Sequence, residues 1–129
     1  MIELELPWPP SVNNYKQVGR MITTANGKLL QTRKNSPETN RYYYEAWVVI
    51  RSYKFSHDVK LPISATISLE VDVFPPDSRK RDLDNILKVL LDSLVRGGLI
   101  VDDSQVARLL VERKAIIPQG KVIIRVTEL

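Results

Sequence analysis

The amino-acid sequence predicts a small α+β fold, a sheet with two main helices. Residues 64–74 alternate apolar and polar side chains, which is the period of a strand buried on one face. Residues 37–55 and the segment that begins at Asp82 instead repeat apolar residues at helical spacing. A chain of 129 residues, 43% hydrophobic, has enough apolar material for one domain and too little length for two. We therefore expect a single domain over residues 1–129.

The N-terminal segment predicts a strand, a shaped loop and a hairpin. Residues 2–6 alternate apolar and acidic side chains and predict a half-buried strand. Three prolines among the next four residues end this strand, and the loop after them presents the amides of Asn13 and Asn14. Strands at 20–25 and 28–32 flank Asn26-Gly27, which is typical of a type I′ turn with positive φ at both residues.

The first helix has a clear start signal. Ser36 is a good N-cap, Pro37 suits the first helical position, and Glu38 places an acid in the first turn. We expect the helix over about 37–55. The residues expected to face the core recur at helical spacing: Tyr43, Ala46, Trp47 and Ile50.

The second helix and two strands complete the chain. Asp82 is a good N-cap for a helix with a continuous apolar stripe, and Gly97-Gly98 is typical of a helix end. Two apolar stretches follow, at 109–117 and 122–126, separated by a segment with proline and glycine. They predict a terminal hairpin.

Composition excludes several classes of chemistry. Without cysteine the chain has no disulfide, thiolate zinc site, iron–sulfur cluster or cysteine nucleophile. The one histidine, His57, lies in a polar stretch and favours a solvated loop position. Hydrolytic chemistry would have to use carboxylates, lysines, hydroxyls or a bound metal. The sequence shows no secretory signal and no apolar run of about 18 residues, so we expect a cytoplasmic protein with no membrane partner.

Three acids are candidates for a metal site: Asp82, Asp84 and Asp103. Two carboxylates about 4 Å apart repel by roughly 4 kcal/mol at an effective dielectric of 20, so such a cluster needs a cation. Mg²⁺ suits a site of carboxylates, waters and phosphate oxygens. A structural reading stays open, in which Asp82 caps the helix and Asp84 forms a surface pair with Lys88, four residues on. Spacing alone does not show whether Asp103 approaches the helix start.

Positive charge is concentrated in the N-terminal half. Residues 13–60 contain nine lysines and arginines against three acids, a local charge of +6, whereas the whole chain carries +4. Aromatic residues are interleaved with this charge, a mixture able to contact phosphates and to stack on unpaired bases. A second basic run directly precedes the acids and is the better candidate for phosphate contact: Arg79, Lys80 and Arg81. Core aromatics with a solvated basic surface are the alternative.

Three blocks of the sequence, in order, carry a family resemblance. The first is Leu6-Pro7-Trp8-Pro9-Pro10-Ser11-Val12-Asn13-Asn14-Tyr15, the second is Arg81-Asp82-Leu83-Asp84-Asn85 with Lys88, and the third is Gly98 with Val101-Asp102-Asp103-Ser104-Gln105-Val106. Together they resemble the RusA family of Holliday junction resolvases across nearly the whole chain, and least over residues 16–60.

The resemblance implies a small mixed sheet in a homodimeric, RusA-like endonuclease domain. It implies cleavage of four-way DNA junctions by paired symmetric nicks in recombination and repair, with Mg²⁺ as cofactor and Mn²⁺ as its substitute. The family's metal-binding and catalytic acids fall on Asp82, Asp84 and Asp103, and its catalytic lysine falls on Lys88. We expect DNA contacts at the remaining candidates: Asn13, Asn14, Tyr15, Arg79, Lys80 and Arg81. Such proteins are of bacterial, phage or prophage type.

Two other functions stay open at the level of sequence. One is a non-catalytic module that binds junctions or other DNA, in which the acids only cap and solvate a helix. The other is a metal-dependent nuclease that acts on RNA or simple duplex DNA.

Overall fold

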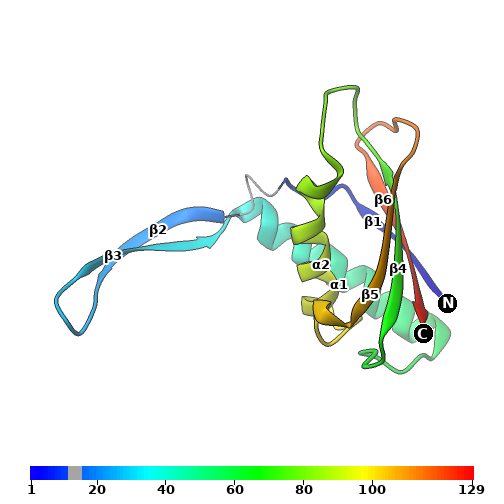
Figure 1. Cartoon of the computed structure of the whole chain (residues 1–129), viewed down its shortest axis with the longest axis horizontal. Coiled ribbons are helices and arrows are strands. Elements are labelled where there is room, and N and C mark those ends of the chain that lie inside the picture. The colour runs from blue at the N-terminus through cyan, green and yellow to red at the C-terminus, as the bar shows by residue number, and fades with distance from the viewer. Residues whose placement is uncertain (12–15) are drawn as a thin grey trace.

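The computed structural model describes residues 1–11 and 16–129, and it shows a four-stranded sheet with two helices on one face and a hairpin that stands apart (Figure 1). The predicted α+β class with a mixed sheet is confirmed. The elements in chain order are β1 (Ile2–Pro7), β2 (Lys16–Thr23), β3 (Leu29–Asn35), α1 (Pro37–His57), β4 (Ile67–Phe74), the 3₁₀ helix η2 (Leu83–Ile86), α2 (Leu87–Arg96), the 3₁₀ helix η3 (Asp103–Gln105), β5 (Val106–Arg113) and β6 (Lys121–Glu128).

The sheet has the order β1-β6-β4-β5, in which β4 and β5 are parallel and the other neighbours are antiparallel. A parallel pair needs a crossover, which η2, α2 and η3 supply. Because α2 must run back against the direction of both strands, η2 follows the carboxyl end of β4 and η3 lies at the amino end of β5. The two ends of the crossover therefore lie at opposite ends of the strands β4 and β5.

The predicted terminal hairpin is wrong. Strands form at β5 and β6, but β4 lies between them and pairs with both. The alternation of side chains shows that a segment is extended but does not show its partner. Here the crossover leaves β5 at the sheet edge, while β6 fills the gap between β1 and β4.

The core lies between the sheet and the helices. From the strands it takes Leu4 and Leu6 of β1 and the alternate residues of β4, as the period of two predicts. Ala46 and Ile50 of α1 are buried against them, but Trp47 is 42% exposed. The expectation that Trp47 faces the core is wrong, because the buried residues of α1 centre near Ala46 and Trp47 lies roughly a quarter turn away, at the edge of the buried face.

The outer face of the sheet is held by ion pairs. Arg125 of β6 approaches three carboxylates, at 2.9 Å from Asp72, 3.5 Å from Glu3 and 3.6 Å from Glu70. The hydrogen bond from Arg125 holds the pKa of Asp72 below its usual range. This face is therefore polar, and both helices cover the opposite face.

The start of the first helix agrees with the sequence, whereas the second begins differently. Ser36 accepts a hydrogen bond from the Thr39 amide at 3.2 Å, and Pro37 opens α1. The turn after Asp82 is 3₁₀, closed by the Asn85 amide on the Asp82 carbonyl at 3.2 Å, so the α-helix begins only at Leu87. Aspartate and asparagine are weak helix formers, which is consistent with a tighter first turn.

The β2–β3 hairpin is confirmed, but its turn is not type I′. The Gly27 amide donates to the Thr24 carbonyl at 2.9 Å and the Thr24 amide donates to the Lys28 carbonyl at 2.8 Å. Of the turn residues only Gly27 has positive φ, at 80°. This is the three-residue loop in which a type I turn is followed by a left-handed glycine. The hairpin forms its own two-stranded sheet and projects away from the rest of the molecule (Figure 1).

Candidate active site

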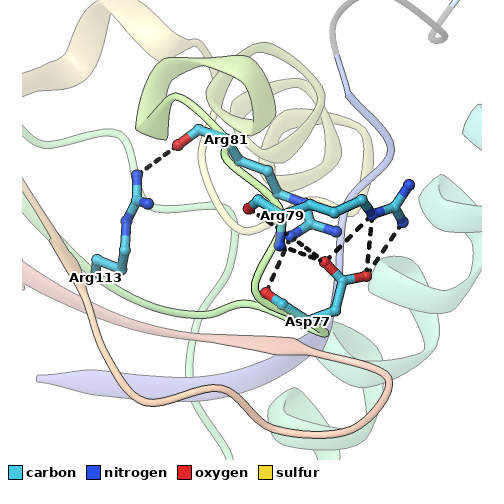
Figure 2. A network of polar contacts seen from close by, with 4 residues as sticks. All are labelled: Asp77, Arg79, Arg81 and Arg113. Atoms are coloured by element: carbon cyan, nitrogen blue, oxygen red, sulfur yellow. Dashed lines mark hydrogen bonds and ion pairs between the residues drawn. The ribbon is translucent and has the colours of Figure 1, made fainter.

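The loop that leads into η2 is organised by Asp77, whose carboxylate binds two arginines (Figure 2). It accepts from the Arg79 amide at 3.0 Å and from the Arg79 guanidinium at 3.1 Å, and it pairs with Arg81 Nη1 at 2.8 Å. The hydrogen bond from Arg81, followed by those from Arg79, holds the pKa of Asp77 well below its usual range. Arg113 of β5 donates to the Arg81 carbonyl, so this loop is tied to the carboxyl end of β5.

The proline-rich segment at residues 7–10 lies against this loop. The Arg81 guanidinium lies 5.7 Å from the centre of the Trp8 ring, which is a cation–π distance. The buried Tyr42 hydroxyl donates to the Pro7 carbonyl at 2.9 Å, and burial raises the pKa of Tyr42, so it stays a neutral donor. A shallow groove of about 450 Å³ runs between Trp8–Ser11 and the basic residues of the loop, including Lys80.

Asp82 and Asp84 follow this loop with their carboxylates free. Both side chains are exposed, and within the described residues neither forms a hydrogen bond or an ion pair. Asp82 occupies the N-cap position of η2 but makes no capping hydrogen bond. The helix-capping reading of Asp82 is therefore not realised.

Lys88 does not pair with Asp84. Its ammonium group is 3.4 Å from Asp92, one α-helical turn further along α2. Asp84 lies in the 3₁₀ turn, which has 3.0 residues per turn, so a spacing of four no longer places it on the same side as Lys88. The surface pair of the alternative, structural reading is therefore absent.

At the other end of α2, Asp102 is held by hydrogen bonds whereas Asp103 has no partner among the described residues. Asp102 accepts from the Ser104 amide at 3.0 Å, and hydrogen bonding from the Ser104 side chain, followed by that from its amide, holds the pKa of Asp102 below the usual range. Gln105 completes a capping box by accepting from the Asp102 amide at 2.8 Å. Asp103 is exposed, and its carboxylate has no partner among the described residues.

The three free acids do not meet within one chain. Gln105 donates to the carbonyls of Ile63 and Ala65, both at 2.8 Å, so η3 is fixed just before β4. Asp82, by contrast, lines a small pocket with Arg113 at the far end of β5. The eight residues of β5, at about 3.3 Å each, separate these ends by roughly 25 Å. Accordingly, the part of the chain that the structure describes contains no group of three acidic or histidine residues able to hold a metal ion.

The residues expected to contact DNA fall into two sets. Arg79, Lys80 and Arg81 lie beside Asp82, but the two arginines are held by Asp77 and Arg81 is only 21% exposed. Lys80 is exposed and forms no ion pair with any described residue. The second set, Asn13, Asn14 and Tyr15, lies outside the described residues. His57 is at the end of α1, stacked on Tyr53 at 3.9 Å between ring centres, and takes no part in either site.

Three further residues position the candidate site: Asp77, Trp8 and Gln105. The sequence reasoning did not single out Asp77, and it gave Trp8 and Gln105 only as members of the family blocks, without the contacts seen here. Two of them carry a recognisable signal. Asp77 begins a loop by binding the amide two residues on, which is the usual role of aspartate in a turn. Asp102 and Gln105 have the spacing of a capping box. The contact of Trp8 with Arg81 joins residues far apart in the chain and has no local signal.

Comparison with known proteins decides the family. The family model for endodeoxyribonuclease RusA matches residues 7–127, nearly the whole chain. This chain belongs to the RusA family. The RusA-family match includes both ends of α2 and the proline-rich segment, and it confirms the resemblance found in the sequence.

Curated relatives of this RusA-family chain come from phages and bacteria. The chain is 37% identical over 125 residues to the crossover junction endodeoxyribonuclease RusA of Enterobacteria phage HK97, which covers 96% of this chain and 92% of the relative. It is 29% identical to the protein of the same name from Enterobacteria phage 82 and 28% identical to that from Escherichia coli K12, with 98% of this chain and 93% of each relative covered. No helix among the described residues is long and apolar enough to cross a membrane.

Proposed function

We propose that this RusA-family chain is a metal-dependent endodeoxyribonuclease that resolves four-way DNA junctions as a homodimer. The proposal rests on the observation that the acids near α2 fall into two kinds, those bound by the fold and those without a partner among the described residues. Each end of α2 has an acid that the fold uses, Asp77 or Asp102, and exposed acids that no described residue binds. The matching relatives are crossover junction endodeoxyribonucleases, which supports the substrate and the reaction.

The free acids fit a hard divalent cation. Asp82, Asp84 and Asp103 offer carboxylate oxygens that form no hydrogen bond with any residue the structure describes, and carboxylate oxygen is the ligand type that Mg²⁺ prefers and Mn²⁺ also accepts. These residues would hold the ion. When bound, Mg²⁺ would supply charge stabilisation at the scissile phosphate and a more acidic water, for which the chain has no suitably placed histidine.

A second copy of the chain would bring the acids together. β5 is an edge strand with one row of backbone groups unpaired within the sheet, and Leu109 and Leu110 on it are 43% and 37% exposed. Antiparallel pairing of β5 with its symmetry mate would place the amino end of the partner's strand beside the carboxyl end of this one. The partner's Asp103 would then approach Asp82 and Asp84. Two such sites per dimer would match the two nicks that resolution requires.

The remaining charged residues would bind the DNA backbone. Lys80 lines the groove beside Asp82 and is free to contact a phosphate. Asp77 and Trp8 hold Arg81 in place and thereby position the loop. Lys88, in the first turn of α2, would stabilise charge that develops on the phosphate. With relatives in phages and bacteria, we propose that the protein acts in the bacterial cytoplasm.

Junction cleavage tests the enzymatic part of the proposal. Purified protein with Mg²⁺ should nick a labelled mobile four-way junction symmetrically and should leave matched duplex, flap and RNA substrates largely uncut. Binding without nicking would favour a non-catalytic junction-binding module. Faster cleavage of RNA or plain duplex would favour another nuclease activity.

Mixing two inactive variants tests the shared site. In a heterodimer of Asp84→Asn and Asp103→Asn, a site shared between protomers is intact once and doubly altered once, so nicking of one strand should reappear. If each chain holds its own site, every site carries one lesion and no nicking returns. The control is a mixture of Asp82→Asn and Asp84→Asn, which alters the same half of each site and should stay inactive under both arrangements.

A further inference from the structure

The β2–β3 hairpin, residues 16–35, carries charge of one sign and is called the arm below. It contains no aspartate or glutamate, and its basic residues are spread along both strands and the turn between them: Lys16, Arg20, Lys28, Arg33 and Lys34. A ribbon with five positive and no negative side chains is complementary to a polyanion such as the phosphate backbone of DNA.

The tip of the arm is apolar on both of its faces. Ile22 lies directly opposite Leu30 in the register, so these two side chains share one face. Met21 and Leu29 are diagonal neighbours on the opposite face, because Met21 pairs with Gln31 and Thr23 with Leu29. All four are exposed, from 43% for Ile22 to 67% for Leu29. A thin ribbon with apolar residues on both faces fits between two apolar surfaces.

Packing within the fold does not explain the apolar side chains at the tip. The arm pairs with no strand of the main sheet, and it contacts the rest of the molecule through the root of β3 on α1. With eight residues in β2 at about 3.3 Å each, it reaches roughly 25 Å from that root (Figure 1). Four large apolar side chains held out in water favour an apolar occupant.

We infer that the arm is a DNA wedge, whose tip inserts between the base pairs that border the centre of the four-way junction while its basic residues contact the flanking phosphates. The inference rests on the proposed function, since only a branched substrate offers exposed base-pair faces beside closely spaced phosphates. Methionine, isoleucine and leucine are among the apolar side chains that proteins insert between base steps. An arm that lay on a second protein copy would need only one apolar face and would not need a uniform positive charge.

A polar tip tests the wedge. The variant Met21→Ser, Ile22→Ser, Leu29→Ser, Leu30→Ser keeps all five positive charges. Its affinity for a four-way junction should fall on the order of tenfold, while its affinity for duplex DNA should stay within about twofold. A 2-aminopurine base at the crossover, measured without Mg²⁺, should brighten with wild-type protein and stay quenched with the variant. Phe55→Ser, which removes an apolar side chain 86% exposed on α1, is the matched control and should behave as wild type.

Crosslinking locates the tip directly. The chain has no cysteine, so Leu29→Cys offers one attachment point for a benzophenone label. Crosslinks to the crossover bases of the junction support the wedge even if the four-serine variant folds poorly. Crosslinks chiefly to a second protein chain, or loss of the dimer in the four-serine variant, would show instead that the arm is a dimer contact and would overturn the inference. Equal junction affinity and equal 2-aminopurine signal in wild type and variant would overturn it as well.

The two proposals fail in different ways. If wild-type protein binds junctions without nicking them in Mg²⁺, the nuclease function fails, yet the fluorescence and crosslinking still report on the wedge. If the wild type and the four-serine variant nick and bind junctions equally well, the nuclease stands and the wedge fails.

Discussion

At each end of α2 one acid binds neighbouring donors while the adjacent acids keep unpartnered carboxylates, but the contacts differ between the two ends. At the amino end Asp77 binds Arg79 and Arg81 and thereby shapes the loop, while Asp82 and Asp84 stay free. At the carboxyl end Asp102 and Gln105 close a capping box made of short local hydrogen bonds, while Asp103 stays free.

The comparison distinguishes the acids that the fold itself uses from those that remain available for a ligand. In each case one carboxylate satisfies backbone or guanidinium donors, and this holds the neighbouring acid in a defined place with its oxygens available. An exposed carboxylate with no partner contributes little to stability, so its replacement should affect function far more than folding.

The largest expected effect is on cleavage by variants of the free acids. Asp84→Asn and Asp103→Asn should each slow junction cleavage by roughly 10³-fold or more, because each removes a negatively charged metal ligand. Junction affinity without metal should be kept or raised, because a charge that repels phosphate is lost. Single-turnover cleavage and thermal melting, measured together, check this. A fall in melting temperature to match the loss of cleavage would mean that these acids are structural after all.

The next prediction concerns Gln105, the capping-box residue that positions Asp103. Gln105→Ala removes four hydrogen bonds, two accepted from the amides of Val101 and Asp102 and two donated to the carbonyls of Ile63 and Ala65. We expect a loss of about 3 kcal/mol in the free energy of unfolding, since partly buried backbone groups lose their partners.

Urea denaturation measures this loss. Val101→Ala, at an exposed side chain next to the same box, is the control and should change stability by less than about 0.5 kcal/mol. A Gln105→Ala protein as stable as wild type would show that the box is not what holds Asp103 in place.

Much of this architecture could be predicted from the sequence, because the relevant signals are local. The periodicity of 64–74, the cap at Ser36-Pro37 and the turn glycine at 27 each determine structure within a few residues. Strand order could not be predicted, since the position of β5 depends on the path of the whole crossover.

The same limit applies to the candidate site. Residue types and motif spacing pointed to Asp82, Asp84 and Asp103, but the separation of Asp103 from the other two follows from the parallel pairing of β4 and β5. The four-residue spacing of Asp84 and Lys88 also suggested a contact, but only if both residues lie in an α-helix. Because η2 is a 3₁₀ helix, Asp84 is turned away from Lys88.

A smaller effect is expected from the acid that shapes the amino end. Because the pKa of Asp77 is lowered in the folded protein, its contribution to stability is complete above about pH 4 and is lost as the pH falls through the folded-state value. Wild-type protein should therefore lose melting temperature on acidification below pH 4 more steeply than Asp77→Asn. At pH 7 the variant should melt only a few degrees lower, because the network is exposed. Parallel curves for the two proteins would show that Asp77 is not linked to folding.

The smallest expected effect concerns Lys88, which lies in the first turn of α2 and is held by Asp92 at 3.4 Å. Lys88 is exposed and Asp92 is half-buried, and the lysine precedes the acid in the chain, which is the weaker order for a helical i,i+4 pair. Such a pair contributes about 0.3 kcal/mol, so its loss in Asp92→Asn should raise the cleavage rate by no more than about twofold as Lys88 becomes free to turn toward the phosphate. Single-turnover cleavage at saturating Mg²⁺ measures the change, and Glu112→Gln on β5 is the control for loss of one surface charge. A rate that falls more than tenfold in Asp92→Asn would place Asp92 among the residues that hold Lys88 for the reaction, and the functional site would then extend along α2 rather than being confined to its ends.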